Sequence, residues 1–372
     1  MAASAPPRIA LLGVGGIGGW LGSRLMEAGK QVAEVVLIAR GEHGAAIRER
    51  GLRLNVTSVP DGAVTAVQSA PGAAEVYSSI EEALKQQAKP VDYILLGVKT
   101  WQVRDAAAQC KPFLAPGGCV ITTQNGVEAP LQAADALGHR SVVASSLNVL
   151  AYIDGPGVVS MKAVPSKMAF GEAFAEDGSE LTDPAAAESP RTARLLQALR
   201  QCKGVTSEIA PHGAWPMIWE KALLMCCIGP LGAVTRASLD MITTVPETRA
   251  LWKAAITEVA ECAEAKGHLI KGKTVEQAVQ EVMDRMTKQG QDQPGVTQST
   301  LRDVVTGKPS EINELSGGII RAGASVGVPT PTHNFMLAAL LPQELRARGE
   351  KKYSLMGVPG GAPHVQPATP SL

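Results

Sequence analysis

The stretch RIALLGVGGIGGWLG, residues 8–22, decides the fold of the first part of the chain. It begins with a short apolar run, which is typical of a buried parallel strand. Gly13, Gly15 and Gly18 then form the pattern GxGxxG, and a segment with helical periodicity follows. In such a strand–turn–helix unit the glycines allow a tight turn, the approach of a pyrophosphate and close packing of helix on strand. The stretch therefore predicts a dinucleotide-binding site.

Residues near this turn refine the prediction. Backbone N–H groups at the start of the helix, at Gly16 and Ile17, are expected to face the phosphates. The second strand, AEVVLIAR, ends in Arg40, where sites that prefer NAD usually place an acidic residue. An arginine can hold a 2′-phosphate instead, so NADPH is favoured over NADH. The alternative is that Arg40 is an ordinary solvated surface residue.

Outward from this unit, the first half of the chain alternates strands and helices. The apolar runs VDYILLGVK, GCVITTQ and SVVASSLNV are predicted strands, separated by segments with helical periodicity. This is the pattern of a doubly wound α/β sheet. Three later runs, GVVSMK, KMAFGE and GVTSEIA, are expected to complete the same sheet. Residues 173–191 are small, acidic and proline-bearing, which predicts an inserted surface loop.

The second half of the chain has a different pattern. After about residue 211 the strand signal ends, and apolar residues recur at helical spacing to roughly residue 347. We therefore expect a Rossmann-type α/β domain over residues 1–210 and an all-α domain over residues 211–348. The Gly- and Pro-rich tail, residues 349–372, is expected to be disordered.

Composition excludes several classes of function. The 372 residues hold 35 basic and 35 acidic side chains, so the basic excess of a nucleic-acid-binding domain is missing. No apolar run reaches the roughly 18 uninterrupted residues of a transmembrane helix, so no membrane partner is expected. The six cysteines show neither CxxC nor metal-finger spacing, which favours buried free thiols in a reducing compartment and no metal site. A cytoplasmic protein is the expectation.

A single lysine raises the question of catalysis. In AWPMIWEKALLMCCIGPLGAV, residues 214–234, the charged residues are Glu220 and Lys221 alone. Lys221 could extend its ammonium group to solvent from an otherwise buried helix. It could instead act as a proton donor, because hydride reduction of a ketone leaves an alkoxide and partial burial lowers a lysine pKa toward the working range.

The chain resembles the ketopantoate reductase (2-dehydropantoate 2-reductase) family over about residues 8–345. This family is implied by blocks that occur in its order: IALLGVGGIGG, LIARGEHGAAIRERGL, ILLGVKTWQVRDA, TTQNGVEA, WEKALLMCC, STLRDVVTGKPSEINELSGGII and AGASVGVPTPTHNFM. The resemblance implies a Rossmann domain followed by a helical domain, with the active site in the cleft between them. It also implies a small 2-keto acid as substrate, and a homodimer is one assembly open to such a chain.

The resemblance assigns roles to particular residues. Lys221 matches the catalytic lysine that donates the proton. Asn125 in TQNGV matches an asparagine near nicotinamide and substrate, and Lys99 in LGVKTWQV matches a lysine near the cofactor. Taken without the resemblance, Asn125 would be a turn residue and Lys99 an ordinary helix-start lysine, although both follow strand ends where doubly wound folds bind ligands.

Two further residues are expected to bind the substrate. The resemblance implies that Ser299 holds the keto-acid carboxylate and that Glu311 engages the hydroxyl end of the substrate, with a catalytic role as well. Without it, Ser299 would be a helix N-cap and Glu311 an acidic residue at the start of a helix.

The chain also departs from the family pattern. Asparagines usually follow the catalytic lysine at four and eight positions, but Met225 and Gly229 stand there, and Pro230 is expected to end or kink the helix.

The leading hypothesis is NADPH-dependent reduction of ketopantoate to pantoate, a step of pantothenate and coenzyme A synthesis. The alternatives are reduction of a more apolar 2-keto acid or ketone, and dinucleotide binding without catalysis. A redox role of Cys226 and Cys227 stays open.

Overall fold

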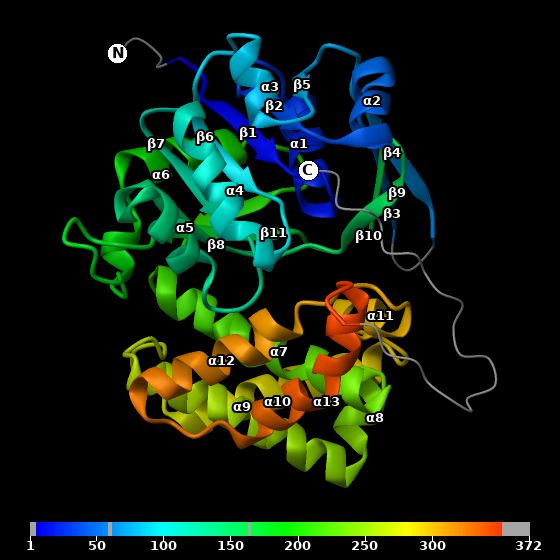
Figure 1. Cartoon of the computed structure of the whole chain (residues 1–372), viewed down its shortest axis with the longest axis vertical. Helices are drawn as coiled ribbons and strands as arrows, with labels where there is room; N and C mark the ends of the chain where they lie inside the picture. Colours follow the sequence, from blue (N-terminus) through cyan, green and yellow to red (C-terminus); the bar gives the residue numbers. More distant parts are fainter. Residues whose placement is uncertain (1–4, 59–61, 163–164, 352–372) are drawn as a thin grey trace. The chain divides into compact units, whose positions relative to one another are not determined.

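The computed structural model describes residues 5–58, 62–162 and 165–351 (Figure 1). The chain folds into two compact units that meet, along the chain, between Ile218 and Trp219. This division falls inside helix α7 (Ala214–Thr235), a few residues after the predicted boundary at residue 210. The tail that was predicted to be disordered lies beyond Lys351, outside the described residues, apart from its first three residues.

Unit 1 is built on a sheet of eight strands in the order β12-β11-β8-β7-β6-β1-β2-β5. Its neighbouring strands are parallel except for the antiparallel pair of β8 and β11. The α/β prediction is thereby confirmed. The strands are β1 (Arg8–Leu12), β2 (Glu34–Ile38), β5 (Glu75–Tyr77), β6 (Val91–Leu96), β7 (Leu114–Thr122), β8 (Val142–Asn148), β11 (Lys167–Glu172) and β12 (Thr206–Ile209).

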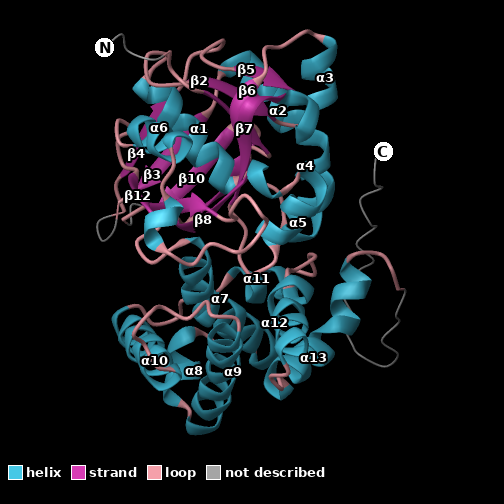
Figure 2. Ribbon diagram, turned by 90° about the vertical axis from the view of Figure 1, so that its left-hand side faces the viewer, coloured by secondary structure: helices cyan, strands magenta, loops and turns pink. Residues whose placement is uncertain are grey.

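Helices cover both faces of this sheet. Figure 2 shows α1 (Gly16–Ala28) and α6 (Pro190–Leu199) on one side of the strands and α4 (Val103–Cys110) and α5 (Ala129–Leu137) on the other. Alternate residues of each strand enter the core beneath α1 and α6, as the period-2 geometry of a strand requires. The remaining helices of unit 1 are α2 (Gly41–Arg50) and α3 (Ile80–Lys85).

A second sheet corrects one prediction. The run GVVSMK forms β10 (Val158–Lys162), but this strand belongs to a separate four-stranded sheet in the order β4-β3-β10-β9. The later runs do join the main sheet as β11 and β12. A buried strand has the same apolar composition in either sheet, so the pattern alone did not assign its partner. The other members are β3 (Arg53–Thr57), β4 (Val64–Gln68) and β9 (Ala151–Gly155).

The segment predicted as a surface loop, residues 173–191, is partly packed into unit 1. Phe174 is 6% exposed, and its ring lies edge-on to the ring of Trp215, 5.7 Å between centroids. The Trp215 indole N–H donates to the carbonyl of Ala173 at 2.8 Å. Ala187, in the short 3-10 helix Pro184–Ala187, is fully buried. Most of the segment is exposed or half-buried, but Ala173, Phe174 and Ala187 are buried in unit 1.

Unit 2 is helical throughout its described residues, as predicted (Figure 2). We expected Pro230 to end or kink helix α7; α7 continues through Pro230 to Thr235, so the proline does not end it. Length and composition alone would let α7 cross a membrane, but most of it is buried inside the protein. The other helices are α8 (Leu239–Thr244), α9 (Pro246–Ala265), α10 (Val275–Asp292), α11 (Ser299–Val305), α12 (Ile312–Val326) and α13 (Pro331–Ala347).

A buried carboxylate holds the start of α13. Glu258, on α9, accepts hydrogen bonds from the backbone N–H groups of Thr332 at 2.7 Å and His333 at 3.1 Å. These are among the first N–H groups of the helix, which have no partner within it. The His333 ring is fully buried beside the carbonyl of Ala255, 3.2 Å away, and burial lowers the pKa of His333 to about 4.

Candidate active site

The carboxyl ends of four parallel strands bring the predicted cofactor residues of unit 1 to one edge. The Gly13 turn follows β1, Arg40 follows β2, Lys99 follows β6 and Asn125 follows β7. These strands are adjacent and parallel, so their carboxyl ends point the same way. This is the edge at which doubly wound folds bind ligands.

The three glycines of the fingerprint are required for different reasons. Gly13 has φ of +94°, and its carbonyl oxygen lies so close to Gly18 that a Cβ built there would be 2.1 Å away. The same oxygen would lie 2.3 Å from a Cβ on Gly97, at the end of β6. By contrast, a Cβ on Gly15 would meet nothing within 4 Å. Gly15 therefore borders open space, where a pyrophosphate could approach the backbone.

Helix α1 contains more glycines than the fingerprint needs, because it packs on two sheets. A Cβ on Gly16 would lie 2.2 Å from the carbonyl oxygen of Ala151, in β9. A Cβ on Gly19 would lie 2.5 Å from a methyl of Val159, in β10. The run GGIGGWLG thus lets the second sheet approach α1 from the side opposite the main sheet.

Gln124 is a site residue that our sequence interpretation missed. Its side-chain amide donates to the carbonyl oxygens of Leu96 at 2.6 Å and Val98 at 2.9 Å. The preceding Thr123 hydroxyl also donates to Leu96, at 2.7 Å. These bonds tie the end of β7, which carries Asn125, to the end of β6. The signal available in the sequence was the polar run TTQN directly after an apolar strand.

The two cationic side chains at this edge are exposed. Arg40 is the N-cap residue of α2, in extended conformation directly after β2. Lys99 is the N-cap residue of a short 3-10 helix, and its ammonium nitrogen lies 5.7 Å from the centre of the Trp101 ring. Asn125 is half-buried in the turn after β7. Both cations therefore lie on the exposed surface at this edge, and a phosphorylated ligand would be attracted to such charges.

Unit 2 brings Lys221 and Glu311 together. Lys221 lies on α7 and is only partly exposed, while Glu311 is the N-cap residue of α12. Burial lowers the pKa of Lys221 to about 8, and the negative charge of the Glu311 carboxylate opposes that shift. A lysine with such a pKa can exchange a proton near neutral pH.

Ser299 is carried by a helix that packs with those of Lys221 and Glu311. It is the first residue of α11, and Gln298 precedes it as N-cap, so the alternative interpretation of Ser299 as the N-cap does not hold. One apolar cluster joins the four helices α7, α11, α12 and α13 through these buried residues: Ala233, Leu301, Val304, Ile312 and Leu340. Lys221, Ser299 and Glu311 therefore belong to helices, or to the cap of a helix, that pack around one apolar cluster.

The two positions that depart from the family pattern differ in their surroundings. Met225, one turn after Lys221, is half-buried. A Cβ on Gly229 would lie 2.9 Å from the hydroxyl oxygen of Thr300, so this glycine is the close contact between α7 and α11 rather than an opening. Cys226 and Cys227 are both fully buried, and burial raises the pKa of Cys227 well above its usual range. Such thiols resist oxidation.

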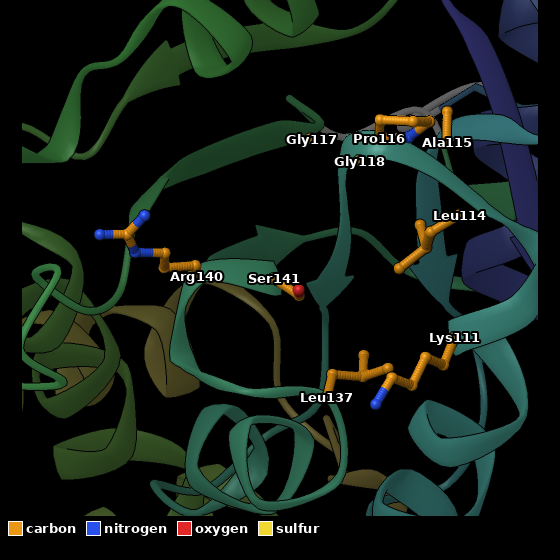
Figure 3. Close-up of a pocket in the computed structure, with 9 residues that line it drawn as sticks. All are labelled: Lys111, Leu114, Ala115, Pro116, Gly117, Gly118, Leu137, Arg140 and Ser141. Carbon is orange, nitrogen blue, oxygen red and sulfur yellow. The ribbon is translucent and has the colours of Figure 1, made fainter.

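A surface pocket of unit 1 lies away from these residues (Figure 3). It is at the amino-terminal ends of β7 and β8 and contains none of the predicted site residues. Figure 3 shows Lys111 extending toward Leu137, while Arg140 points away from the other lining residues, so the two charges do not converge on one ligand. Within the described ranges, no group of three His, Cys, Asp or Glu side chains is arranged to hold a metal. The pocket does not compete with the carboxyl edge as a candidate site.

Comparison with known proteins now identifies the family. The model described as "Ketopantoate reductase PanE/ApbA" matches residues 9–174, and "Ketopantoate reductase PanE/ApbA C terminal" matches residues 214–344. The chain belongs to the ketopantoate reductase family. It is therefore an oxidoreductase that acts on a ketone, and a nicotinamide dinucleotide is the expected hydride donor.

Individual relatives are similar to this chain over nearly their whole length. The 2-dehydropantoate 2-reductase of Mesorhizobium japonicum is 27% identical, over 89% of this chain and 96% of that protein. The PanE/ApbA family ketopantoate reductase of Ralstonia eutropha is 25% identical, with a TM-score of 0.72 over 91% of this chain and 99% of that one. A D-mandelate dehydrogenase solved with NADH and anilino(oxo)acetate shares the fold, with a TM-score of 0.73 at 19% identity over 91% and 99% of the two chains.

Proposed function

We propose that the protein reduces 2-dehydropantoate to pantoate with NADPH, as a step of pantothenate and coenzyme A synthesis. The observation that carries the proposal is the electrostatic interaction of Lys221 with Glu311 in unit 2, in a chain whose unit 1 has an open glycine turn at Gly15. The family's activity supports the reaction class. That both units serve a single cleft, and that the protein is a cytoplasmic homodimer, stay predictions.

The chemistry divides between the units. The dinucleotide, when bound, supplies the hydride that reaches the ketone carbon. Lys221 gives a proton to the oxygen, so no free alkoxide accumulates, and it recovers its proton from water. We assign the substrate carboxylate to Ser299, the distal hydroxyl to Glu311 and the alignment of the reacting groups to Asn125. Lys99 and the turn from Gly13 to Gly18 would hold the dinucleotide.

The preference for NADPH rests on Arg40. This exposed arginine stands at the end of β2, where an acidic side chain would repel a 2′-phosphate. Replacing Arg40 with alanine should raise the KM for NADPH by about 10-fold and leave the KM for NADH nearly unchanged, because only NADPH carries the group that the guanidinium contacts.

One observation favours a second candidate substrate. Met225 is half-buried one turn from Lys221, where the family pattern has an asparagine, and a thioether contacts apolar groups better than hydroxyl groups. A more apolar 2-keto acid or ketone is therefore the alternative. The cofactor and the proton donor would be the same for both substrates.

A substrate panel tests the proposal directly. Oxidation of NADPH would be followed with ketopantoate, with 2-keto acids that lack its hydroxyl, and with NADH as the control cofactor. The highest kcat/KM with ketopantoate would support the assignment. A preference for an apolar 2-keto acid would establish the alternative. Tight NADPH binding without turnover of any 2-keto acid would contradict both.

A further inference from the structure

The residue before Glu311 is held by side chains from α13. One carboxylate oxygen of Glu344 accepts two hydrogen bonds from Ser310, from its backbone N–H at 2.8 Å and from its hydroxyl at 2.6 Å. The other carboxylate oxygen accepts from the guanidinium of Arg348 at 2.6 Å. Ser310 is fully buried and Glu344 is 3% exposed, so water does not compete for these bonds.

Arg348 extends this hydrogen-bond network to the residues on either side of Glu311 and its neighbours. It donates to the carbonyl oxygen of Ser310 at 3.2 Å and to the carboxylate of Glu314 at 3.3 Å. The Ser310 carbonyl belongs to the peptide bond that joins Ser310 to Glu311. Since a peptide unit is planar, fixing this oxygen also fixes the direction in which the chain enters Glu311.

Helix α13 also contacts α11, the helix that contains Ser299. The side-chain amide of Gln343, next to Glu344, donates to the carbonyl of Val304 near the end of α11. Leu340, one turn earlier on α13, packs in the apolar cluster that joins α7, α11 and α12. Helix α13 thus contacts each element that carries a predicted residue of unit 2.

We propose that Glu344, with Arg348, is a positioning residue for Glu311 and thereby a determinant of substrate specificity. This rests on the proposed function. The buried carboxylate touches no reacting atom. It orients the start of α12 so that the Glu311 carboxylate faces Lys221 and the hydroxyl end of the substrate. Arg348 meanwhile pairs with the carboxylate of the neighbouring Glu314.

Glu344→Gln is the primary test, because it keeps the shape of the side chain and removes its charge. The amide presents one acceptor oxygen to donors on both sides, so either the Ser310 or the Arg348 bonds are lost. We expect kcat/KM for ketopantoate to fall by about 10-fold to 100-fold, chiefly through KM, as for a binding group that is misplaced. The value for 2-keto-3-methylbutanoate, which lacks the hydroxyl, should change much less, and NADPH affinity should be unchanged.

A double-mutant cycle separates positioning from general damage. Glu311→Gln should cause a similar selective loss, and adding Glu344→Gln to it should cause little more, because the second residue acts through the first. Independent, additive losses would overturn the proposal, as would equal losses for both keto acids. Arg346→Gln, at an exposed position of the same helix, is the matched control.

Two further measurements keep the result clear. Ser310→Ala removes one bond of the network and Ser310→Thr retains its hydroxyl, so a partial loss that threonine rescues would support the proposal if Glu344→Gln does not fold. If the wild type turned over no keto acid, the proposed function would fail. The rate of Lys221 acylation, followed by mass spectrometry, would still show whether the Glu311 carboxylate lies beside the Lys221 amine. An acylation rate with the same pH dependence in wild type and Glu344→Gln would then overturn the positioning role.

Discussion

The candidate residues of unit 1 and those of unit 2 are chemically different. In unit 1 the ligand edge consists mainly of backbone: glycines at Gly13, Gly15 and Gly18, strand ends, and carbonyls held by Gln124. In unit 2 the corresponding groups are the side chains of Lys221 and Glu311, and a buried polar network holds Ser310, the residue before Glu311. A backbone site is sensitive to added volume, whereas a side-chain site is sensitive to lost charge. The two sets of residues should therefore fail in different ways.

The largest expected effect is the loss of Lys221. Lys221→Ala removes the proposed proton donor, so kcat should fall by about 10²-fold to 10⁴-fold. NADPH affinity should stay at the wild-type value, because unit 1 supplies the cofactor contacts. Steady-state kinetics and fluorescence titration with NADPH measure the two quantities. Glu220→Gln, the adjacent half-buried position, is the control and should remain active.

The pH profile sharpens the same test. Lys221 donates only when protonated, and its pKa is lowered to about 8, so kcat/KM should be constant below this pH and fall above it. Glu311 opposes the lowering, so Glu311→Gln should move the basic limb to lower pH. Equal loss of turnover and NADPH binding in Lys221→Ala would contradict the separation of roles between the two units.

The second effect concerns added volume in unit 1. Gly16→Ala places a Cβ 2.2 Å from the Ala151 carbonyl oxygen, so backbone must move, and we expect a loss of about 1–3 kcal/mol or more in the free energy of unfolding. Gly15→Ala meets no atom within 4 Å and should unfold like the wild type. It should instead weaken NADPH binding, because its methyl group occupies the space of the pyrophosphate.

Thermal unfolding and NADPH titration of this pair decide the point. The two variants differ by one position and by the same methyl group, so each is the control for the other. Unchanged NADPH affinity in Gly15→Ala would contradict the assignment of that open space to the phosphates. Unchanged stability in Gly16→Ala would show that β9 can move away from α1 at little cost.

The third and smallest effect is a pH-dependent loss of stability through unit 2. His333 has a pKa of about 4 in the folded chain and an ordinary value of 6.5, so the unfolded state binds the proton more tightly. Its contribution to stability is complete above pH 6.5 and is lost as the pH falls toward 4. At pH 5 the loss should be about 2 kcal/mol relative to pH 7.

Chemical unfolding at these two pH values measures this effect. His333→Gln should unfold with a smaller difference between pH 7 and pH 5, while His212→Gln, at an exposed position, should match the wild type. An identical pH dependence in all three proteins would show that the His333 ring does not limit the acid stability of unit 2.

The features that the local sequence pattern did not predict correctly have a common physical cause. β10 was predicted to join the main sheet, Pro230 to end or kink α7, and Ser299, taken without the family resemblance, to cap α11. In each case the local pattern was compatible with two structures, and packing against distant segments chose between them. The short helix α8 and the packed part of residues 173–191 were missed for the same reason. Propensity is a weak preference that tertiary contacts override.

The sequence by itself determined the class of each unit and the chemistry to be expected. The fingerprint at Gly13–Gly18 works through glycine backbone freedom over a few residues, and strand and helix periods are equally local. Only the tertiary structure decided why Gly16 and Gly19 are glycines, that Thr300 fills the space beside Gly229, and that Glu344 holds Ser310. These pairs are far apart in the chain and carry no motif. Their contacts exist because close packing of whole elements brings particular atoms together.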